Sequence, residues 1–158
     1  MKNNNIFFLL SAVSCMALAQ PTAPAASSAA MQPKTENGIT YLCGGVGLDE
    51  STAMKQAAKS YDLMSTFAAQ DGSYLADVNV DILDKSGTTI LHTTCGGPMM
   101  LVKLPHAGNY RLRAQVDGNA QTKTAKVASG RNTGPQRLVF VWPAAQTGLQ
   151  QSGPKEAQ

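Results

Sequence analysis

The sequence predicts a mainly β fold, an antiparallel β-sandwich preceded by a short strand and one α-helix. Three observations support this fold class. After residue 62, apolar and polar residues alternate with a period of two in several short segments. Turn-forming residues separate these segments about every ten residues, which is typical of sandwiches. Before residue 62, one segment has its apolar residues at helical spacing.

The elements before the alternation are a strand and a helix. Residues 39–45, ITYLCGG, have the composition of a short strand. The next segment is expected to form a helix from Glu50 to Tyr61, with Asp49 as its N-cap and Glu50 near the positive end of the helix dipole. One face of this helix would carry Ala53, Met54, Ala57, Ala58 and Tyr61.

The expected strands of the sandwich are residues 63–69, 76–83, 88–95, 99–104, 110–116, 120–127 and 137–142. Asp117-Gly118-Asn119 is a strong hairpin signal between two of them. Pro105 and Gly108 are expected to reverse the chain, because Pro cannot donate to a sheet ladder and Gly tolerates positive φ. Tyr110 would then be the first inward residue, with its ring in the core and its hydroxyl bonded to nearby backbone.

Residues 1–19 have the composition of a secretory signal peptide. Lys2 supplies a positive charge, and residues 6–16 form an apolar segment too short to span a bilayer. Residues 17–19, Ala-Leu-Ala, fit the small-x-small cleavage rule. Cleavage before Gln20 is therefore expected.

Two alternatives to this cleavage remain open. Residues 12–15, AVSC, loosely resemble a lipobox, in which Cys15 would be lipidated and become the first residue. The apolar segment could also be a buried N-terminal helix. No later segment is apolar enough to cross a membrane. The expected location is therefore the bacterial periplasm or the exterior, with a lipoprotein as the minor alternative.

The 158 residues are enough for one ordinary domain. Behind the signal peptide, residues 20–37 are rich in Pro, Ala and Ser and are expected to form a disordered leader. Residues 144–158 have the same character and are expected to form a disordered tail. The folded domain is expected to comprise residues 38–143.

Removal of the signal peptide would leave two cysteines, Cys43 and Cys95. In an oxidising compartment, two cysteines of a small secreted chain are expected to form a disulfide. Closing a loop of this length would stabilise the fold by roughly 4 kcal/mol in the chain-entropy model. Two separate buried thiols are the alternative, because the sequence does not show how far apart the two Cα atoms lie.

Two segments together resemble the carboxypeptidase regulatory-like domain, a transthyretin-like and immunoglobulin-like β-sandwich. They are residues 76–91, ADVNVDILDKSGTTIL, and residues 101–114, LVKLPHAGNYRLRA. The shared elements are a V-x-V-x-I strand, a D-x-x-G turn and an L-P-x-x-G-x-Y-x-L-x-A hairpin. The chain is also similar to small secreted proteins of proteobacteria. The resemblance implies a non-catalytic domain that aids folding, adhesion or assembly, and it assigns no functional residues.

The charged and nucleophilic residues give little support for catalysis. The net charge of +3 is spread along the chain, without the basic cluster of a nucleic-acid binder. His92 and Cys95 are three residues apart on an expected strand, so their side chains would point to opposite faces. His106 lies in an expected turn, and Asp77 and Asp81 are expected on a solvated sheet face. No catalytic residue, metal site or cofactor is therefore predicted.

The best candidate for binding is a basic sheet face. Arg111 and Arg113 project from one face of a strand, and Lys123 would extend this face if it lies opposite them. Such a face could contact an envelope protein or an acidic polysaccharide. The predicted function is a secreted, non-catalytic module for binding or assembly in the periplasm or cell envelope. The alternative is a small secreted enzyme or metal-handling protein that uses His92, His106 or Cys95, and the oligomeric state is not indicated.

Overall fold

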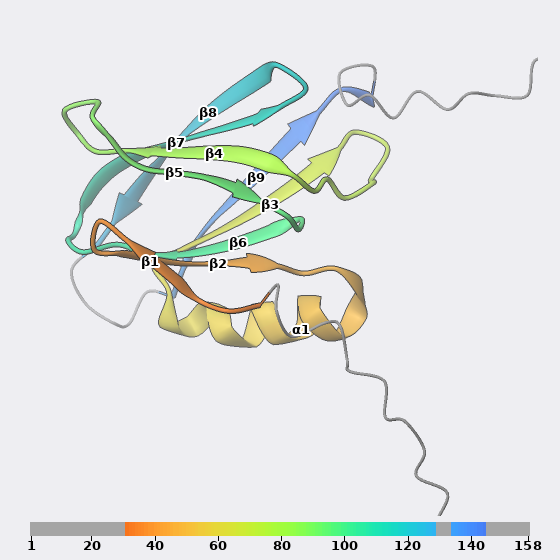
Figure 1. Ribbon diagram of the computed structural model, residues 1–158, viewed down its shortest axis with the longest axis horizontal. Coiled ribbons are helices and arrows are strands. Elements are labelled where there is room, and N and C mark those ends of the chain that lie inside the picture. Colours follow the sequence, from red (N-terminus) through yellow and green to blue (C-terminus); the bar gives the residue numbers. More distant parts are fainter. Residues whose placement is uncertain (1–30, 129–133, 145–158) are drawn as a thin grey trace, which may run out of the picture.

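The computed structural model describes residues 31–128 and 134–144, and this part of the chain forms three layers. A four-stranded sheet, sheet B, packs on a five-stranded sheet, sheet A, and helix α1 (Gly47–Ala57) lies on the other side of sheet A (Figure 1). The expected mainly β sandwich with one α-helix is confirmed. The expected signal peptide and residues 145–158 lie outside the described part.

Nine strands build the two sheets of the described chain. Sheet A has the order β1 (Lys34–Glu36), β2 (Ile39–Gly44), β6 (Met99–Lys103), β3 (Leu63–Ala69) and β9 (Gln136–Trp142). Sheet B has the order β5 (Thr89–Cys95), β4 (Val78–Leu83), β7 (Gly108–Val116) and β8 (Asn119–Val127).

One strand pair differs from the expected antiparallel arrangement. β3 and β9 run parallel, in a register that extends from Leu63 opposite Gln136 to Ala69 opposite Trp142. A tight hairpin forces two strands to be antiparallel, but β9 reaches β3 only after the chain has crossed over from sheet B. The connection therefore permits either direction, and the sequence contains no local signal for it.

The core lies between the two sheets and is filled by the inward residues of the alternating strands. Val78, Val80 and Ile82 of β4 are almost completely buried, whereas Asn79 between them is exposed. Three rings of sheet A meet them from the other side: Phe67, Phe140 and Trp142. Burial of each large apolar side chain stabilises the fold by about 1.5–3 kcal/mol, so these rows hold the two sheets together.

The reversal at residues 104–108 carries the chain from sheet A to sheet B. β6 ends before it and β7 begins after it, and the two strands belong to different sheets. The reversal itself is confirmed, but it is an arch between the sheets and not the expected hairpin. Tyr110 is buried, and its hydroxyl donates a hydrogen bond to the carbonyl of His106 at 2.9 Å, as expected.

A two-residue turn joins β7 and β8, as the sequence predicts. Asp117 has φ of 47° and Gly118 has φ of 81°, which are the left-handed conformations that such a turn requires. The turn places Val116 opposite Asn119 and thereby fixes which residues face each other along the whole β7–β8 ladder.

Helix α1 begins earlier than expected, at Gly47, and its N-cap is Val46 and not Asp49. The carboxylate Oε2 of Glu50 accepts a hydrogen bond from the backbone N–H of Val46 at 3.1 Å. This bond serves one of the N–H groups at the helix start. Because the helix begins at Gly47, Asp49 lies inside its first turn. The helix ends at Ala57 and continues as a 3₁₀ turn, Ala58–Ser60.

The folded part begins before the expected residue 38. Lys34–Glu36 form β1, which pairs with β2 through a turn at Asn37-Gly38, a dipeptide typical of hairpins. β2 itself is not a separate element before the sandwich, because it lies inside sheet A between β1 and β6. Its residues Ile39 and Tyr41 face the core, and Leu42 faces the helix. In the part of the chain that the structure describes, no helix is long and apolar enough to span a membrane.

Candidate binding surface

The outer face of sheet B carries polar side chains and is not covered by another layer of the described chain. We call this surface the open polar face, and it is formed by Asn79, Asp81, His92, Thr94, Arg111, Arg113, Thr122 and Thr124. These residues come from β4, β5, β7 and β8, and they alternate with the apolar residues that fill the core. The period of two therefore positions the surface.

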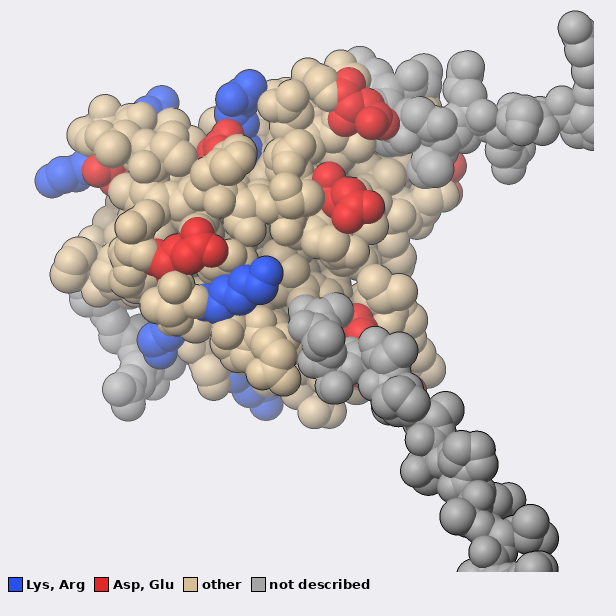
Figure 2. All heavy atoms as spheres, viewed as in Figure 1, with Lys and Arg blue, Asp and Glu red and all other residues tan. Residues whose placement is uncertain are grey.

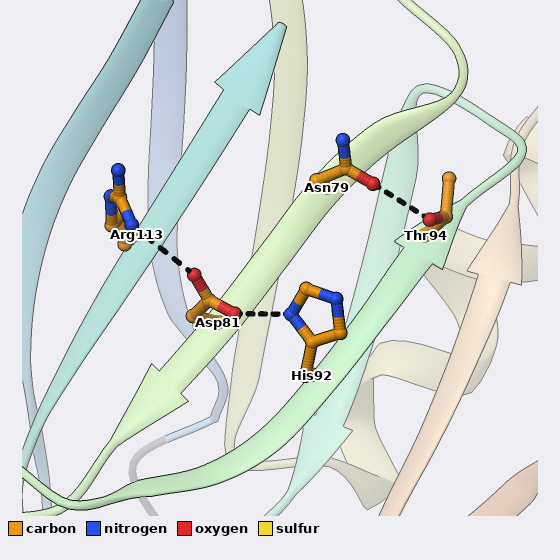
Figure 3. Close-up of polar contacts among 5 residues, drawn as sticks. All are labelled: Asn79, Asp81, His92, Thr94 and Arg113. Atoms are coloured by element: carbon orange, nitrogen blue, oxygen red, sulfur yellow. Dashed lines mark hydrogen bonds and ion pairs between the residues drawn. The ribbon is translucent and has the colours of Figure 1, made fainter. Parts of the chain in front are cut away.

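Asp81 lies at the centre of the open polar face (Figure 3). In register, it stands opposite His92 on β5 and opposite Arg113 on β7. His92 Nδ1 lies 2.5 Å from Asp81 Oδ1, and Arg113 Nη1 lies 3.7 Å from Asp81 Oδ2. One carboxylate thus bridges two potentially cationic groups across three strands. The His92 side chain is 71% exposed, so this group is accessible to a partner.

A second pair lies beside this row. Thr94 Oγ1 on β5 donates a hydrogen bond to Asn79 Oδ1 on β4 at 2.7 Å (Figure 3). The two residues stand opposite each other in the antiparallel ladder, which brings their Cβ atoms within contact distance. The pair orients the Asn79 amide on the open polar face.

Arg111 lies at the edge of the open polar face, over the β4–β5 turn. A Cβ atom added at Gly87 would lie 2.8 Å from Arg111 Nη2, which locates the guanidinium against this turn. The turn is held by Asp84, whose Oδ1 accepts hydrogen bonds from the hydroxyl of Ser86 at 2.6 Å and from the N–H of Thr88 at 3.0 Å. The Ser86 hydroxyl, with the backbone N–H groups of the turn, lowers the pKa of Asp84 from its ordinary value.

Lys123 does not extend this surface as expected. It stands opposite Leu112 on β7, and Leu112 is buried, so Lys123 projects from the inner side of sheet B. Its Nζ lies 5.7 Å from the ring centre of Phe140 on β9. Arg111 and Arg113 face Thr124 and Thr122 instead. The register follows from the Asp117-Gly118 turn, so counting from that turn would have placed Lys123 correctly from the sequence.

The open polar face is consequently mixed in charge. It contains two arginines and one histidine, but the Asp81 carboxylate offsets part of their charge. In the view of Figure 2, basic and acidic side chains also form small separate groups and no large area of one sign. The Asp81–His92 pair was not predicted from the sequence. Counting from the turn at residues 84–87 would place Asp81 opposite Leu91, because the register shifts at Ile82/Leu83, so the sequence offers no simple signal for this pair.

The cysteines are bonded as expected. Cys43 of β2 and Cys95 of β5 form a disulfide with a Cα–Cα distance of 5.4 Å, which joins sheet A to sheet B. Near this bond the turn between β5 and β6 passes close to the end of β2, since a Cβ atom at Gly97 would overlap the carbonyl of Gly44. The sulfur of Cys95 is therefore engaged and fully buried.

The two histidines lie in different settings. His92 is on the outer side of β5 and Cys95 on the inner side, as their spacing predicts, and His106 is exposed in the β6–β7 arch. Within residues 31–128 and 134–144, no three His, Cys, Asp or Glu side chains are grouped so that they could hold a metal ion. Compared with known proteins, the chain matches no family model and no curated protein.

Proposed function

We propose that the chain is a non-catalytic β-sandwich module that acts outside the cytoplasm, in the bacterial periplasm or cell envelope, by binding a partner protein. The signal-peptide composition of residues 1–19 supports export. The resemblance of residues 76–91 and 101–114 to carboxypeptidase regulatory-like domains supports a role in assembly. Lipidation at Cys15 would anchor the same module to a membrane.

The observation that carries this proposal is the disulfide between the two sheets. Cys43 and Cys95 lie in opposite layers of the sandwich, and such bonds persist in oxidising compartments. The space between the sheets supports a structural role, because it is filled by apolar side chains. Among the described residues, Ser65 is the only buried side chain of the polar or charged types.

The open polar face is the surface that we assign to the partner. Loops and helix α1 leave it uncovered in the described chain, and its arginines are each exposed. Arginine is enriched at protein interfaces because its planar group can bind carboxylates in a bidentate manner. The mixed charges favour a protein partner with complementary charges over a uniformly acidic polysaccharide.

Affinity capture tests the proposal. The exported chain is used as bait with envelope extract, beside Arg111→Gln/Arg113→Gln and the control Lys34→Gln/Lys55→Gln, whose lysines lie on β1 and α1. We expect one constant protein to be captured by the wild type and the control, and several-fold less by the arginine variant. Capture of polysaccharide only, or equal capture by the arginine variant, would contradict the assignment. A free-thiol count of two at Cys43 and Cys95 in the exported chain would contradict the location.

The alternative function, a small secreted enzyme or metal-handling protein, depends on His92. The contact of its ring with Asp81 is the observation that favours it, because a carboxylate orients imidazole in many acid–base and metal sites. Titration with Zn²⁺ or Cu²⁺ tests it. Metal binding that His92→Gln abolishes would support this alternative, and unchanged binding in that variant would remove it.

A further inference from the structure

Helix α1 covers only part of the outer face of sheet A. The apolar cluster beneath the helix contains residues of β2, β6 and the beginning of β3, and it contains no residue of β9. Beyond this cluster, the outward side chains of β3 and β9 are Thr66, Ala68, Arg137, Val139 and Val141. Both valines are exposed, Val139 to 52%. An apolar area of sheet A therefore faces water beside the helix.

The strand pairing joins these residues into one surface. Val141 stands opposite Ala68, and Val139 stands opposite Thr66, in the parallel ladder of β3 and β9. Ala68 also forms a bridge to Tyr74, which is exposed. Residues that stand opposite each other lie on the same face of a sheet. We call this surface the apolar patch, and it consists of Ala68, Tyr74, Val139 and Val141, with Thr66 and Arg137 at its border.

A second exposed apolar group lies at the beginning of helix α1. Val46 is the N-cap, and Leu48 in the first turn is 80% exposed. We call Val46, Leu48 and Asp49 the helix tip. A row of paired residues crosses sheet A from the end of β2 to β9: Gly44, Met99, Thr66 and Val139. The helix tip follows Gly44 closely in the chain, so the tip and the apolar patch lie at the same end of sheet A (Figure 1).

The helix tip cannot cover the apolar patch of its own copy. β2 and β9 are separated by β6 and β3, which corresponds to about 14 Å at the usual strand spacing. The buried side chain of Met54 also holds the helix on the cluster beneath it. The five large apolar side chains that are exposed in the described chain thus form two separate groups: Val46 and Leu48 at the tip, and Tyr74, Val139 and Val141 in the patch.

The two groups carry charges of opposite sign. Asp49 is an exposed acidic residue of the helix tip, and Arg137 is an exposed basic residue at the border of the apolar patch. Both ion pairs found within residues 31–128 and 134–144 involve Asp81, so Asp49 and Arg137 have no ionic partner there. A surface with an apolar centre and an acidic residue therefore matches a surface with an apolar centre and a basic residue.

We propose that the apolar patch of one copy binds the helix tip of a second copy, in a dimer with two-fold symmetry. Both surfaces lie on the outer side of sheet A, so a two-fold axis between them places each tip on the patch of the other copy. The contact covers the five exposed large apolar side chains and brings Arg137 of each copy to Asp49 of the other. This inference goes beyond the module function proposed above, because it concerns self-association and residues outside the open polar face.

Sedimentation equilibrium of the exported chain at several protein concentrations tests the dimer. We expect an equilibrium between monomer and dimer for the wild type. Val141→Lys places a charge in the apolar patch and should weaken the dimer about tenfold or more, because burying an unpaired charge is unfavourable. The matched control is Thr124→Lys, which adds the same charge at an exposed strand position of the open polar face. This control should dimerise like the wild type.

Exchanged charges test the pairing between the two copies. Arg137→Glu and Asp49→Arg should each weaken the dimer about fivefold or more, because like charges then meet at both contacts. A mixture of the two variants should restore dimerisation, because opposite charges meet at both contacts of the mixed dimer. Mixing would not reverse a weakening that arises from misfolding of either variant.

Several outcomes would overturn the inference. They are a wild type that stays monomeric at every concentration, growth into higher oligomers, equal weakening by Val141→Lys and Thr124→Lys, charge variants that dimerise like the wild type, and a mixture that does not restore the dimer. Thermal melting checks that the variants fold, and Leu48→Lys at the helix tip replaces Val141→Lys if the latter does not. Capture of the protein partner depends on Arg111 and Arg113, so its failure is distinguishable from failure here.

Discussion

The outer faces of the two sheets differ in whether another layer covers them. On sheet A, four outward side chains of β2, β3 and β6 are apolar and pack under helix α1: Leu42, Met64, Met99 and Leu101. On sheet B, the outward side chains form the open polar face and remain in water. Both sheets share one apolar interior, so the difference lies entirely in what each sheet presents to the outside.

The difference is visible in individual strands. β6, MMLVK, is buried at its first four residues, because both of its faces are covered. β4, VNVDIL, alternates between fully buried and more exposed residues, because only one face is covered. β6 thus has the continuous apolar run expected of a strand covered on both faces, and β4 has the alternation expected of a strand whose outer face is free. The free face is where a partner can bind without displacing part of the fold.

The largest expected effect comes from breaking the bond between the sheets. Replacing both Cys43 and Cys95 by Ala should lower the free energy of unfolding by about 4 kcal/mol, because the unfolded chain is no longer closed into a loop. Urea unfolding measures this change. Reduced wild-type protein is the control and should lose the same amount, whereas an unchanged midpoint in the variant would show that the two layers do not depend on this bond.

The next effect separates the two outer faces directly. Leu101→Ala removes a fully buried side chain between sheet A and α1, and we expect a loss of about 3 kcal/mol from the cavity that remains. Thr122→Ala on the open polar face is the matched strand variant and should stay within about 0.5 kcal/mol of the wild type. Equal losses of unfolding free energy in the two variants would contradict the distinction between the covered face of sheet A and the open polar face.

The sequence predicts most of the sandwich because its signals are local. Alternation from Val78 to Ile82 and the Asp117-Gly118 turn specify strands and a hairpin without reference to distant residues. The parallel pairing of β3 with β9 was not predictable in this way, because it depends on how the chain crosses between layers. The helix start shifted for a similar reason: the side chain of Glu50 reaches back to Val46, and intrinsic N-cap preference alone favours Asp49.

The candidate site was only partly predictable. Arg111 and Arg113 lie on an exposed face as expected, because alternation decides which side of a strand a residue occupies. Lys123 was assigned to the wrong side, because its neighbour across the ladder depends on the register and not on composition.

The β4–β5 turn gives a smaller, pH-dependent effect at the edge of the open polar face. Asp84 has a lowered pKa in the folded chain, so its contribution to stability is complete above its ordinary pKa of 3.8 and is lost as the pH falls through the lower folded value. Asp84→Ala should therefore lower the melting temperature at neutral pH. The decrease should be smaller than the decrease caused by Leu101→Ala. The difference from the wild type should shrink below pH 3.8. A difference that is independent of pH would show that the carboxylate is not the group that holds the turn.

The smallest effect is expected at the centre of the open polar face. Asp81→Asn removes the charge that His92 and Arg113 share, but His92 is largely exposed, and exposed ion pairs contribute little to stability. We expect a loss of about 0.5 kcal/mol in urea unfolding, reduced further by added salt. A double-mutant cycle with His92→Gln isolates the pair itself. A coupling of about 2 kcal/mol or more would mean that the row supports the sheet, and the open polar face would then lose its distinction from the covered face of sheet A.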